Sequence, residues 1–219
     1  MRRLLTFLTL AVFLSATSVA IADTFTGTDG PETLTGTIRD DRIFALGGND
    51  TLLGGIGGDF LDGGRGGDVI RGESGNDSLV GEACNNERCD APETDTFYGG
   101  TGNDFIESNA CRSGNSGSEC PPGRSNDRMY GEGGNDQLVL RAPGRALLNG
   151  GTGNDRLTGN AGPETFVGGA GTDTIRAGSG NDRINARDGR RDTVNCGPGR
   201  DSVRADRADR LTACERVSR

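Results

Sequence analysis

The clearest copy of a repeat in this chain is Gly150-Gly151-Thr152-Gly153-Asn154-Asp155-Arg156-Leu157-Thr158. Its form is G-G-x-G-x-D-x-U-x, in which U is a large apolar residue. Four further segments follow that form closely: Gly54–Asp62, Gly63–Arg71, Gly99–Glu107 and Gly168–Arg176. Degenerate copies fill nearly all of the chain after residue 26. Such a fixed period predicts stacked repeats, because one unit alone is too small to bury its own apolar residue.

Each place in the nine-residue unit has a physical reason. Glycine at the first, second and fourth places allows the positive φ angles that a Cβ would forbid. The sixth place supplies a carboxylate. The seventh to ninth places predict a very short strand whose middle side chain points inward, because side chains alternate along a strand. Asparagine is common at the fifth place, where we expect it because it tolerates the left-handed region. It occurs there at Asn49, Asn76, Asn103, Asn126, Asn135, Asn154 and Asn181.

The eighth place excludes a purely disordered chain. A composition rich in glycine and aspartate is typical of disorder, but a disordered chain does not keep apolar residues in register. The eighth place holds Leu34, Ile43, Leu52, Leu61, Ile70, Leu79, Phe97, Ile106, Met129, Leu138, Leu148, Leu157, Phe166, Ile175, Ile184, Val194 and Val203. We therefore predict an all-β fold, a parallel β-roll or β-solenoid in which two units make one 18-residue coil.

In such a coil the turns of alternate units stack on opposite edges, about 4.8 Å apart. Counting units along the chain predicts which aspartates share an edge. One edge is expected to hold Asp50, Asp68, Asp104, Asp136, Asp155, Asp173 and Asp192. The other is expected to hold Asp41, Asp59, Asp77, Asp95, Asp127, Asp182 and Asp201. Carboxylates at this spacing repel one another unless a cation lies between them, and calcium takes six to eight oxygen ligands from carboxylates and carbonyls.

These motifs resemble the hemolysin-type (RTX) calcium-binding repeat, and the resemblance covers nearly the whole chain after residue 26. It implies several Ca²⁺ ions, each held by two aspartates of stacked turns together with carbonyls of the glycine region. The carboxylates of the implied sites are those of Asp41, Asp50, Asp59, Asp68, Asp77, Asp95, Asp104, Asp127, Asp136, Asp155, Asp173, Asp182, Asp192 and Asp201. The implied glycines are Gly55, Gly57, Gly64, Gly66, Gly151, Gly153, Gly169 and Gly171.

Composition excludes several classes of function. The chain has 32 Asp and Glu against 24 basic residues, a net charge of −8, and removal of a leader containing Arg2 and Arg3 would make it −10. An acidic chain is a poor ligand for nucleic acid, which needs a basic surface. Histidine is absent, which excludes Ser-His-Asp catalysis and the histidine-based zinc sites of metalloproteases. We expect no enzyme.

Residues 1–22 are typical of a secretory signal peptide. Arg2 and Arg3 precede an apolar run, Leu4–Leu14, and Ala20-Ile21-Ala22 forms an A-x-A cleavage site. The run is shorter than the roughly 20 residues of a membrane span, and no later stretch could cross a bilayer. Proteins that carry RTX repeats commonly use an uncleaved C-terminal signal, so this leader departs from the pattern. We predict a secreted or cell-surface protein.

The mature chain is expected to form two repeat blocks, residues 23–139 and 150–219, separated by a degenerate seam at 140–149. The first block is interrupted near 81–98 and 108–121. In the seam, Ala146 stands where aspartate is expected, which predicts a lost calcium site. Glu164 stands in the aspartate place of the unit at 159–167 and predicts a weaker one. Sequence leaves open whether the units at 81–89, 141–149 and 159–167 bind metal.

Six cysteines in an exported chain predict disulfides rather than a zinc site, since neither C-x₂-C spacing nor histidine is present. Cys84–Cys89 and Cys111–Cys120 are each expected to close a local loop. Cys196 and Cys214 lie 18 residues apart, one full coil, so we expect them to stack at a distance that allows a disulfide cap. Asp209 falls one place out of register there. This ending resembles the C-termini of exported actinobacterial-type calcium-binding repeat proteins.

Three functions are compatible with these features. The first is a non-catalytic, exported calcium-binding protein that folds when calcium binds. The second is a calcium-stiffened adhesin that binds a cell-surface component or an extracellular polysaccharide. The third is a polysaccharide-active enzyme, which is disfavoured because every candidate aspartate is explained by the repeat.

Overall fold

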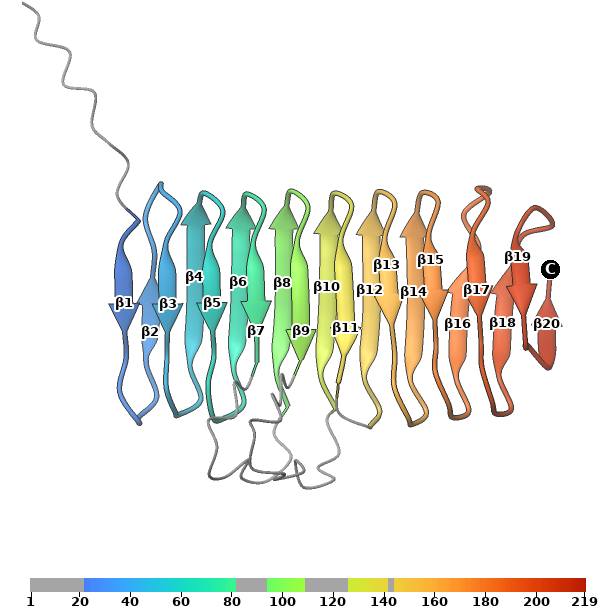
Figure 1. The fold of residues 1–219 in the computed structure, drawn as a ribbon, viewed down its shortest axis with the longest axis horizontal. Coiled ribbons are helices and arrows are strands. Elements are labelled where there is room, and N and C mark those ends of the chain that lie inside the picture. The colour runs from blue at the N-terminus through green and yellow to red at the C-terminus, as the bar shows by residue number, and fades with distance from the viewer. Residues whose placement is uncertain (1–21, 82–93, 109–125, 142–143) are drawn as a thin grey trace, which may run out of the picture.

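The fold is known from a computed structural model, which describes residues 22–81, 94–108, 126–141 and 144–219. The chain winds as a solenoid of parallel coils whose strands form two ten-stranded sheets. In Figure 1 the coils follow one another along the long axis, and the strands of the two sheets point in opposite directions. The predicted all-β solenoid with 18-residue coils is confirmed.

The odd-numbered strands make the first sheet, sheet A, in the order of the chain. They are β1 (Thr24–Thr26), β3 (Arg42–Phe44), β5 (Phe60–Asp62), β7 (Ser78–Val80), β9 (Phe105–Ser108), β11 (Gln137–Leu140), β13 (Arg156–Thr158), β15 (Thr174–Arg176), β17 (Thr193–Asn195) and β19 (Arg210–Thr212). These strands match the seventh to ninth places of their units. Several of them are short because a glycine-rich turn follows directly, as Gly63 and Gly64 follow β5.

The even-numbered strands make the second sheet, sheet B. They are β2 (Thr33–Thr35), β4 (Thr51–Ile56), β6 (Val69–Ser74), β8 (Thr96–Thr101), β10 (Arg128–Gly133), β12 (Leu147–Thr152), β14 (Thr165–Ala170), β16 (Arg183–Ala186), β18 (Ser202–Ala205) and β20 (Arg216–Ser218). Between β4 and β14 these strands reach into the glycines of the following unit. The sheet therefore continues into the turns on this side of the coil.

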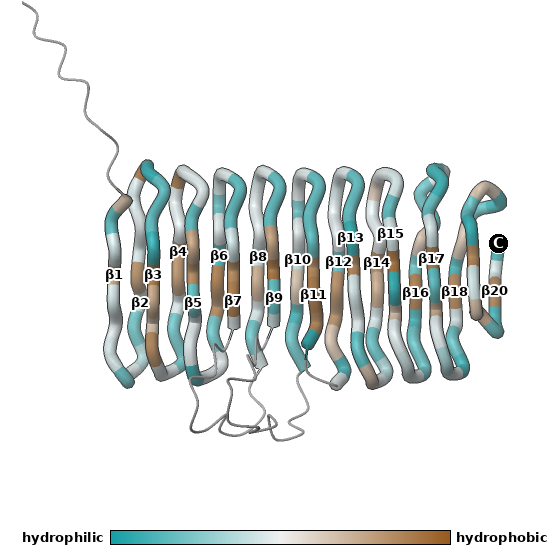
Figure 2. The backbone as a smooth tube through the Cα atoms, viewed as in Figure 1, coloured by the Kyte–Doolittle hydropathy of each residue, from teal (hydrophilic) through white to brown (hydrophobic). Residues whose placement is uncertain are grey.

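The core lies between the two sheets and consists of two columns of apolar side chains, one from each sheet. The eighth-place residues pair one above another, as Met129 does with Leu148 and Leu148 with Phe166. All three side chains are buried, and Phe25, Leu34 and Leu211 pack partly buried against the same core near its two ends. Figure 2 shows hydrophobic colour along the strands and mainly hydrophilic or neutral colour in the turns. One or two inward side chains from most strands thus fill the narrow interior.

The strand register corrects the predicted grouping of the aspartates. Asp68 aligns with Asp95 and Asp77 with Asp104, each pair 27 residues apart rather than 18. The segment between them therefore adds nine residues to one coil, whereas the sequence count treated 81–98 as two ordinary units. As a result, every aspartate before this segment lies on the edge opposite to the predicted one: Asp77 shares an edge with Asp104, and Asp68 shares the other with Asp95. The prediction was wrong on this point because a degenerate unit and an insertion of the same length look alike in sequence.

The other length changes agree with the sequence count. Asp95 and Asp127 align 32 residues apart, which is 14 more than one coil. Asp136 and Asp155 align 19 residues apart, which accommodates the one extra residue of 140–149. Strand pairing continues from β10 through β12 to β14 across that segment. The division into two blocks stays a prediction, and the leader and the pairings Cys84–Cys89 and Cys111–Cys120 lie outside the described residues.

The C-terminal coil is closed by the expected disulfide. Cys196 and Cys214 are bonded, with their Cα atoms 5.2 Å apart. Asp209 lies 17 residues after Asp192 and still stacks on it, because the last coil is one residue shorter than the others. This disulfide ties β17 and β19 of sheet A to the chain that leads into β20.

Removal of this disulfide should loosen the end of the solenoid. We expect Cys196→Ser combined with Cys214→Ser to cost about 2–4 kcal/mol, since an 18-residue loop loses its cross-link. Hydrogen exchange in calcium should show the loss of protection at β17–β20 and little change at β4–β6. If β17–β20 were as well protected in the variant as in the parent, the role of the disulfide as a cap would be contradicted.

Candidate metal centres

One ladder of carboxylates lies in the turns that lead into the strands of sheet A, and we call it ladder A. In each step the backbone N–H of one aspartate donates to Oδ1 of the aspartate one coil later. The distances are 2.7 Å from Asp41 to Asp59 and 2.8 Å from Asp136 to Asp155. Ladder A consists of Asp23, Asp41, Asp59, Asp77, Asp104, Asp136, Asp155, Asp173, Asp192 and Asp209. Each sixth-place carboxylate therefore carries a main-chain hydrogen bond between coils.

Ladder B runs along the opposite edge, before sheet B. The first residue is Glu32, whose N–H donates to Oδ1 of Asp50 at 2.7 Å. The ladder continues through Asp68, Asp95 and Asp127, and later through Glu164, Asp182, Asp201 and Glu215. Ala146 lies between these two runs at the position of a carboxylate, because its carbonyl accepts from Thr165 as an aspartate carbonyl does elsewhere. Ladder B therefore has no carboxylate at Ala146, and the loss of a calcium site there stays a prediction.

The second carboxylate oxygen distinguishes the ends of ladder A from its interior. At the ends, protein donors satisfy it: Thr37 donates its N–H and its hydroxyl to Oδ2 of Asp41, and Asp206 donates its N–H to Oδ2 of Asp209. In the interior, buried Oδ2 atoms receive no hydrogen bond within the described structure at Asp59, Asp77, Asp104, Asp136, Asp155, Asp173 and Asp192. An ionised carboxylate can only accept, so each of these atoms needs an outside donor or a cation.

A small cradle of oxygens lies beside the first glycine of several units. A methyl carbon placed on Gly150 would lie 2.3 Å from Oδ2 of Asp155 and 2.5 Å from the carbonyl oxygen of Gly168, one coil later. At Gly99 the corresponding distances to Oδ2 of Asp104 and the carbonyl of Gly131 are 2.4 and 2.7 Å. Glycine is required here because any side chain would occupy the space next to these two oxygens.

The glycines predicted as metal-site residues all adopt positive φ. These are Gly55, Gly57, Gly64, Gly66, Gly151, Gly153, Gly169 and Gly171. At Gly153 φ is +127°, and a Cβ would lie 1.6 Å from the carbonyl oxygen of Gly134 in the preceding coil. Stacked turns therefore approach one another through backbone alone, which brings their carbonyl groups close to the carboxylate ladders.

The fifth-place asparagines have a different role from the one expected. None of those in the described ranges has a positive φ, and non-glycine residues with positive φ instead occupy the second place, as at Glu73 and Glu132. The asparagine side chains stack between coils: Oδ1 of Asn103 accepts from the backbone N–H of Asn135 at 2.7 Å, and Oδ1 of Asn135 accepts from that of Asn154 at 2.8 Å. Sequence reasoning missed this outer amide ladder because it depends on the coil-to-coil register.

Burial makes these carboxylates unusually basic. Desolvation raises the pKa of Asp77, Asp136 and Asp192 to about 7 and that of Asp155 to about 6. The backbone hydrogen bonds lower each pKa, but the effect of burial is larger, and neighbouring carboxylates raise it further. Desolvation and the charge of Asp182 also raise the pKa of Glu164. The ladders thus hold negative charge at neutral pH only at a considerable cost in free energy.

The donor set fits a hard cation that takes oxygen ligands. Among the described residues, no three His, Cys, Asp or Glu side chains group together as a metal site. An ion would therefore need main-chain carbonyls in addition to one or two carboxylates. Calcium accepts such mixed oxygen sets in flexible geometry, whereas zinc prefers nitrogen and sulfur. The orphaned Oδ2 atoms and the glycine cradles meet this requirement.

Comparison with known families agrees with this chemistry. The sequence profile described as RTX calcium-binding nonapeptide repeat (4 copies) matches residues 26–61, 62–87, 92–111, 123–141, 143–162, 158–192 and 167–203. The chain belongs to this RTX repeat family. The matches cover well over half of the 219 residues, and RTX repeats imply that the chain binds calcium.

Two further observations bear on the RTX chain. A search of curated proteins found no match. In the described part of the chain, no helix has the length and apolar character needed to cross a membrane. Four residues that the sequence did not assign to the metal sites also belong to the RTX ladders: Asp23, Glu32, Asp209 and Glu215. The spacing of Asp23 from Asp41 could have identified the first of them, whereas the short last coil concealed Asp209.

The close approach of the turns predicts a severe effect of one methyl group. Gly153→Ala would place a Cβ against the Gly134 carbonyl, so it should destabilise the calcium-loaded protein strongly. Gly189→Ala is a matched control, since Gly189 has a φ of +88° but no atom within 4 Å of its added Cβ. The control should lose about 1–2 kcal/mol, the cost of a left-handed residue. Urea unfolding in saturating calcium should rank the two losses, and equal losses would show that contact between turns is unimportant.

The raised pKa values predict how metal-free protein responds to pH. A folded-state pKa above the unfolded value means that the folded chain binds more protons, so its stability is greatest below about pH 4 and falls as pH rises through 6–7. We expect protein stripped of metal and dialysed into metal-free buffer to lose β-type circular dichroism between about pH 5 and 8. A β signal that grows over that interval would contradict the burial of the ladders.

Proposed function

We propose that this protein is an exported, non-catalytic calcium-binding repeat protein that folds when it binds several Ca²⁺ ions between its coils. The observation that carries the proposal is the row of buried Oδ2 atoms in the interior of ladder A, which receive no hydrogen bond within the described residues. Near the two ends of the same ladder, at Asp41 and Asp209, backbone N–H groups of the protein donate to the oxygen that we assign to the ion elsewhere.

The proposed ligands of ladder A are its interior aspartates with the carbonyls of stacked glycines, whereas the predicted ligand Asp41 has its second oxygen bonded by Thr37. Asp155 with the Gly168 carbonyl and Asp104 with the Gly131 carbonyl are two such sets. Ladder B would supply further sites through Asp50, Asp182 and Asp201, whose Oδ2 atoms are also buried without a donor within the described structure. The interruption at Ala146 supports one lost site. Glu164 has both side-chain oxygens buried without such a donor, which supports metal binding by this unit.

Folding and binding are coupled in this proposal because neither is favourable alone. The metal-free coil would bury a column of carboxylates, and the unfolded chain has no preformed cage, so the free energy of calcium binding becomes free energy of folding. Extracellular calcium-binding modules typically have dissociation constants of about 10⁻⁴–10⁻³ M. A chain that stays unfolded where free calcium is low and folds outside the cell suits secretion, and proteins with RTX repeats are typically exported.

A non-catalytic role is supported by the interactions that already occupy the carboxylate oxygens of the ladders. The interior aspartates of ladder A accept a hydrogen bond from the adjacent coil through one oxygen, as Asp155 does from Asp136, and the second oxygen of each faces the proposed ion. RTX repeats are generally not catalytic. The acidic side chains that the sequence offers as acid–base groups are therefore engaged in holding the coils together.

The test is calcium titration of metal-free mature protein, followed by circular dichroism and calorimetry. β-type signal should rise with calcium, and chelator should reverse the rise. Asp155→Asn is the informative variant, because its amide oxygen can still accept from Asp136 while its NH₂ group cannot bind a cation. We expect calcium affinity to fall by at least about 10- to 100-fold, the loss caused by removing a group that only orients a metal ligand. In chelator the same variant should be no less stable than the parent, because it buries one charge fewer.

Asp29→Asn is the matched control. Asp29 is 79% exposed and pairs with Arg65 outside both ladders, so the same change of charge should leave calcium affinity within about twofold. Loss of stability by Asp155→Asn in both calcium and chelator would identify a merely structural aspartate. A spectrum of metal-free protein that does not respond to calcium would overturn the proposed function.

A further inference from the structure

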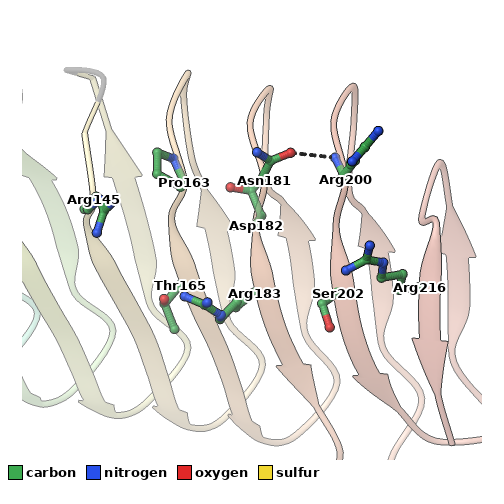
Figure 3. Close-up of a pocket in the computed structure, with 9 residues that line it drawn as sticks. All are labelled: Arg145, Pro163, Thr165, Asn181, Asp182, Arg183, Arg200, Ser202 and Arg216. Carbon is green, nitrogen blue, oxygen red and sulfur yellow. Dashed lines mark hydrogen bonds between the residues drawn. The ribbon is translucent and has the colours of Figure 1, made fainter.

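A groove on the outer side of sheet B lies apart from the cradles of ladder A. It has a volume of about 520 Å³ and is lined by side chains from successive coils near the C-terminus. Its lining includes Arg145, Arg183, Arg200 and Arg216 together with Thr165 and Ser202. Figure 3 shows Arg145, Arg183, Arg200 and Arg216 distributed along the groove rather than gathered at one point.

The four arginine side chains have no acidic partner in the described structure. All four are exposed, and the ion pairs formed there involve Arg39, Arg65 and Arg141 instead. The N–H of Arg200 that donates to Asn181 belongs to the backbone, so its guanidinium is not used in that bond. Within the described residues, the groove thus presents guanidinium groups that have no acidic partner, in a protein whose net charge is negative.

The distribution of charge along the chain adds to this cationic character. Residues 140–219 contain 14 arginines and 10 acidic residues, whereas residues 1–139 contain 10 arginines and 22 acidic residues. Most acidic side chains of the C-terminal part are buried in the ladders, such as Asp155, Asp173 and Asp192, while its arginines point outward. The one acid that lines the groove, Asp182, is itself a buried ladder residue whose Oδ1 accepts from Glu164.

We infer that this groove binds an extended anionic polysaccharide, one that carries carboxylate or sulfate groups. The lining residues belong to coils from β12 to β20, which are four strand spacings or roughly 19 Å apart. A single small anion cannot contact guanidinium groups spread over that length, but successive charges of a linear polyanion can. Arginine suits the role because its planar fork binds carboxylate and sulfate-like oxyanions through paired hydrogen bonds.

The other lining residues favour a glycan over nucleic acid. Thr165, Asn181 and Ser202 supply neutral hydrogen-bonding groups between the arginines, which suits sugar hydroxyls. None of the described residues that line the groove is aromatic, whereas proteins that bind single-stranded nucleic acid stack bases on aromatic rings.

The experiment measures binding of fluorescently labelled chondroitin sulfate oligosaccharides to the full mature protein in calcium, by anisotropy. This probe carries both carboxylates and sulfates. The groove variant is Arg183→Ser with Arg216→Ser, which matches Ser202, the residue between them in the same row of sheet B. The control is Arg156→Ser with Arg210→Ser, which are exposed first residues of strands in sheet A and also lack ion pairs within the described structure.

We expect the groove variant to lose at least tenfold in affinity and the control less than twofold, with neutral dextran not competing. Equal losses in both variants, or no binding by the parent, would overturn the assignment. Tighter binding of oligothymidylate or of phosphatidylglycerol vesicles through the same arginines would overturn it in favour of those ligands. Calcium titration of each variant keeps this result separate from the proposed calcium function, and Arg200→Ser provides a second groove variant if the double variant does not fold.

Discussion

The interaction on which the rest of the structure depends is the contact between a buried carboxylate and the coil before it. One oxygen of each ladder aspartate accepts a backbone N–H from the neighbouring turn, as Asp155 does from Asp136. This bond fixes the distance and the register between coils at both edges. It also forces the carboxylates into a column. Each hydrogen bond that holds two turns together therefore brings another buried negative charge close to its neighbours, and these charges repel one another.

Burial of the apolar interior cannot by itself offset the repulsion between these carboxylates. Most strands contribute only one or two inward apolar side chains, such as Leu148 between Met129 and Phe166, and the buried apolar surface per residue is small for so many ordered residues. Small or narrow cores commonly need metals or disulfides to reach a stable fold. The protein uses a disulfide at its C-terminal coil, and the cradles beside its first-place glycines suit ions along the ladder. Protein donors take over only where the ladder ends, at Thr37 and Asp206.

Because the coils use their edges for the ladders, the outward strand positions are free to vary. The seventh place changes from threonine to arginine and serine along sheet B, as in Thr165, Arg183 and Ser202. Such changes cost the scaffold little, since these side chains lie outside the core. The solenoid therefore acts as a rigid support on which a row of charges can be arranged at the spacing of the strands.

The sequence by itself determined the nine-residue unit, the two-unit coil, the inward eighth place and the carboxylate at the sixth. Each of these follows from local periodicity, which the chemistry of glycine, aspartate and apolar residues makes visible. The tertiary structure alone decided which aspartates share an edge, because that depends on whether residues 81–98 add one unit or two to the solenoid. It also decided that Asn103 and Asn135 stack between coils, that Asp209 joins ladder A despite its spacing, and that four distant arginines line one groove. These are relations between coils, and the physical reason they escape the sequence is that a single insertion shifts the register of everything that follows it.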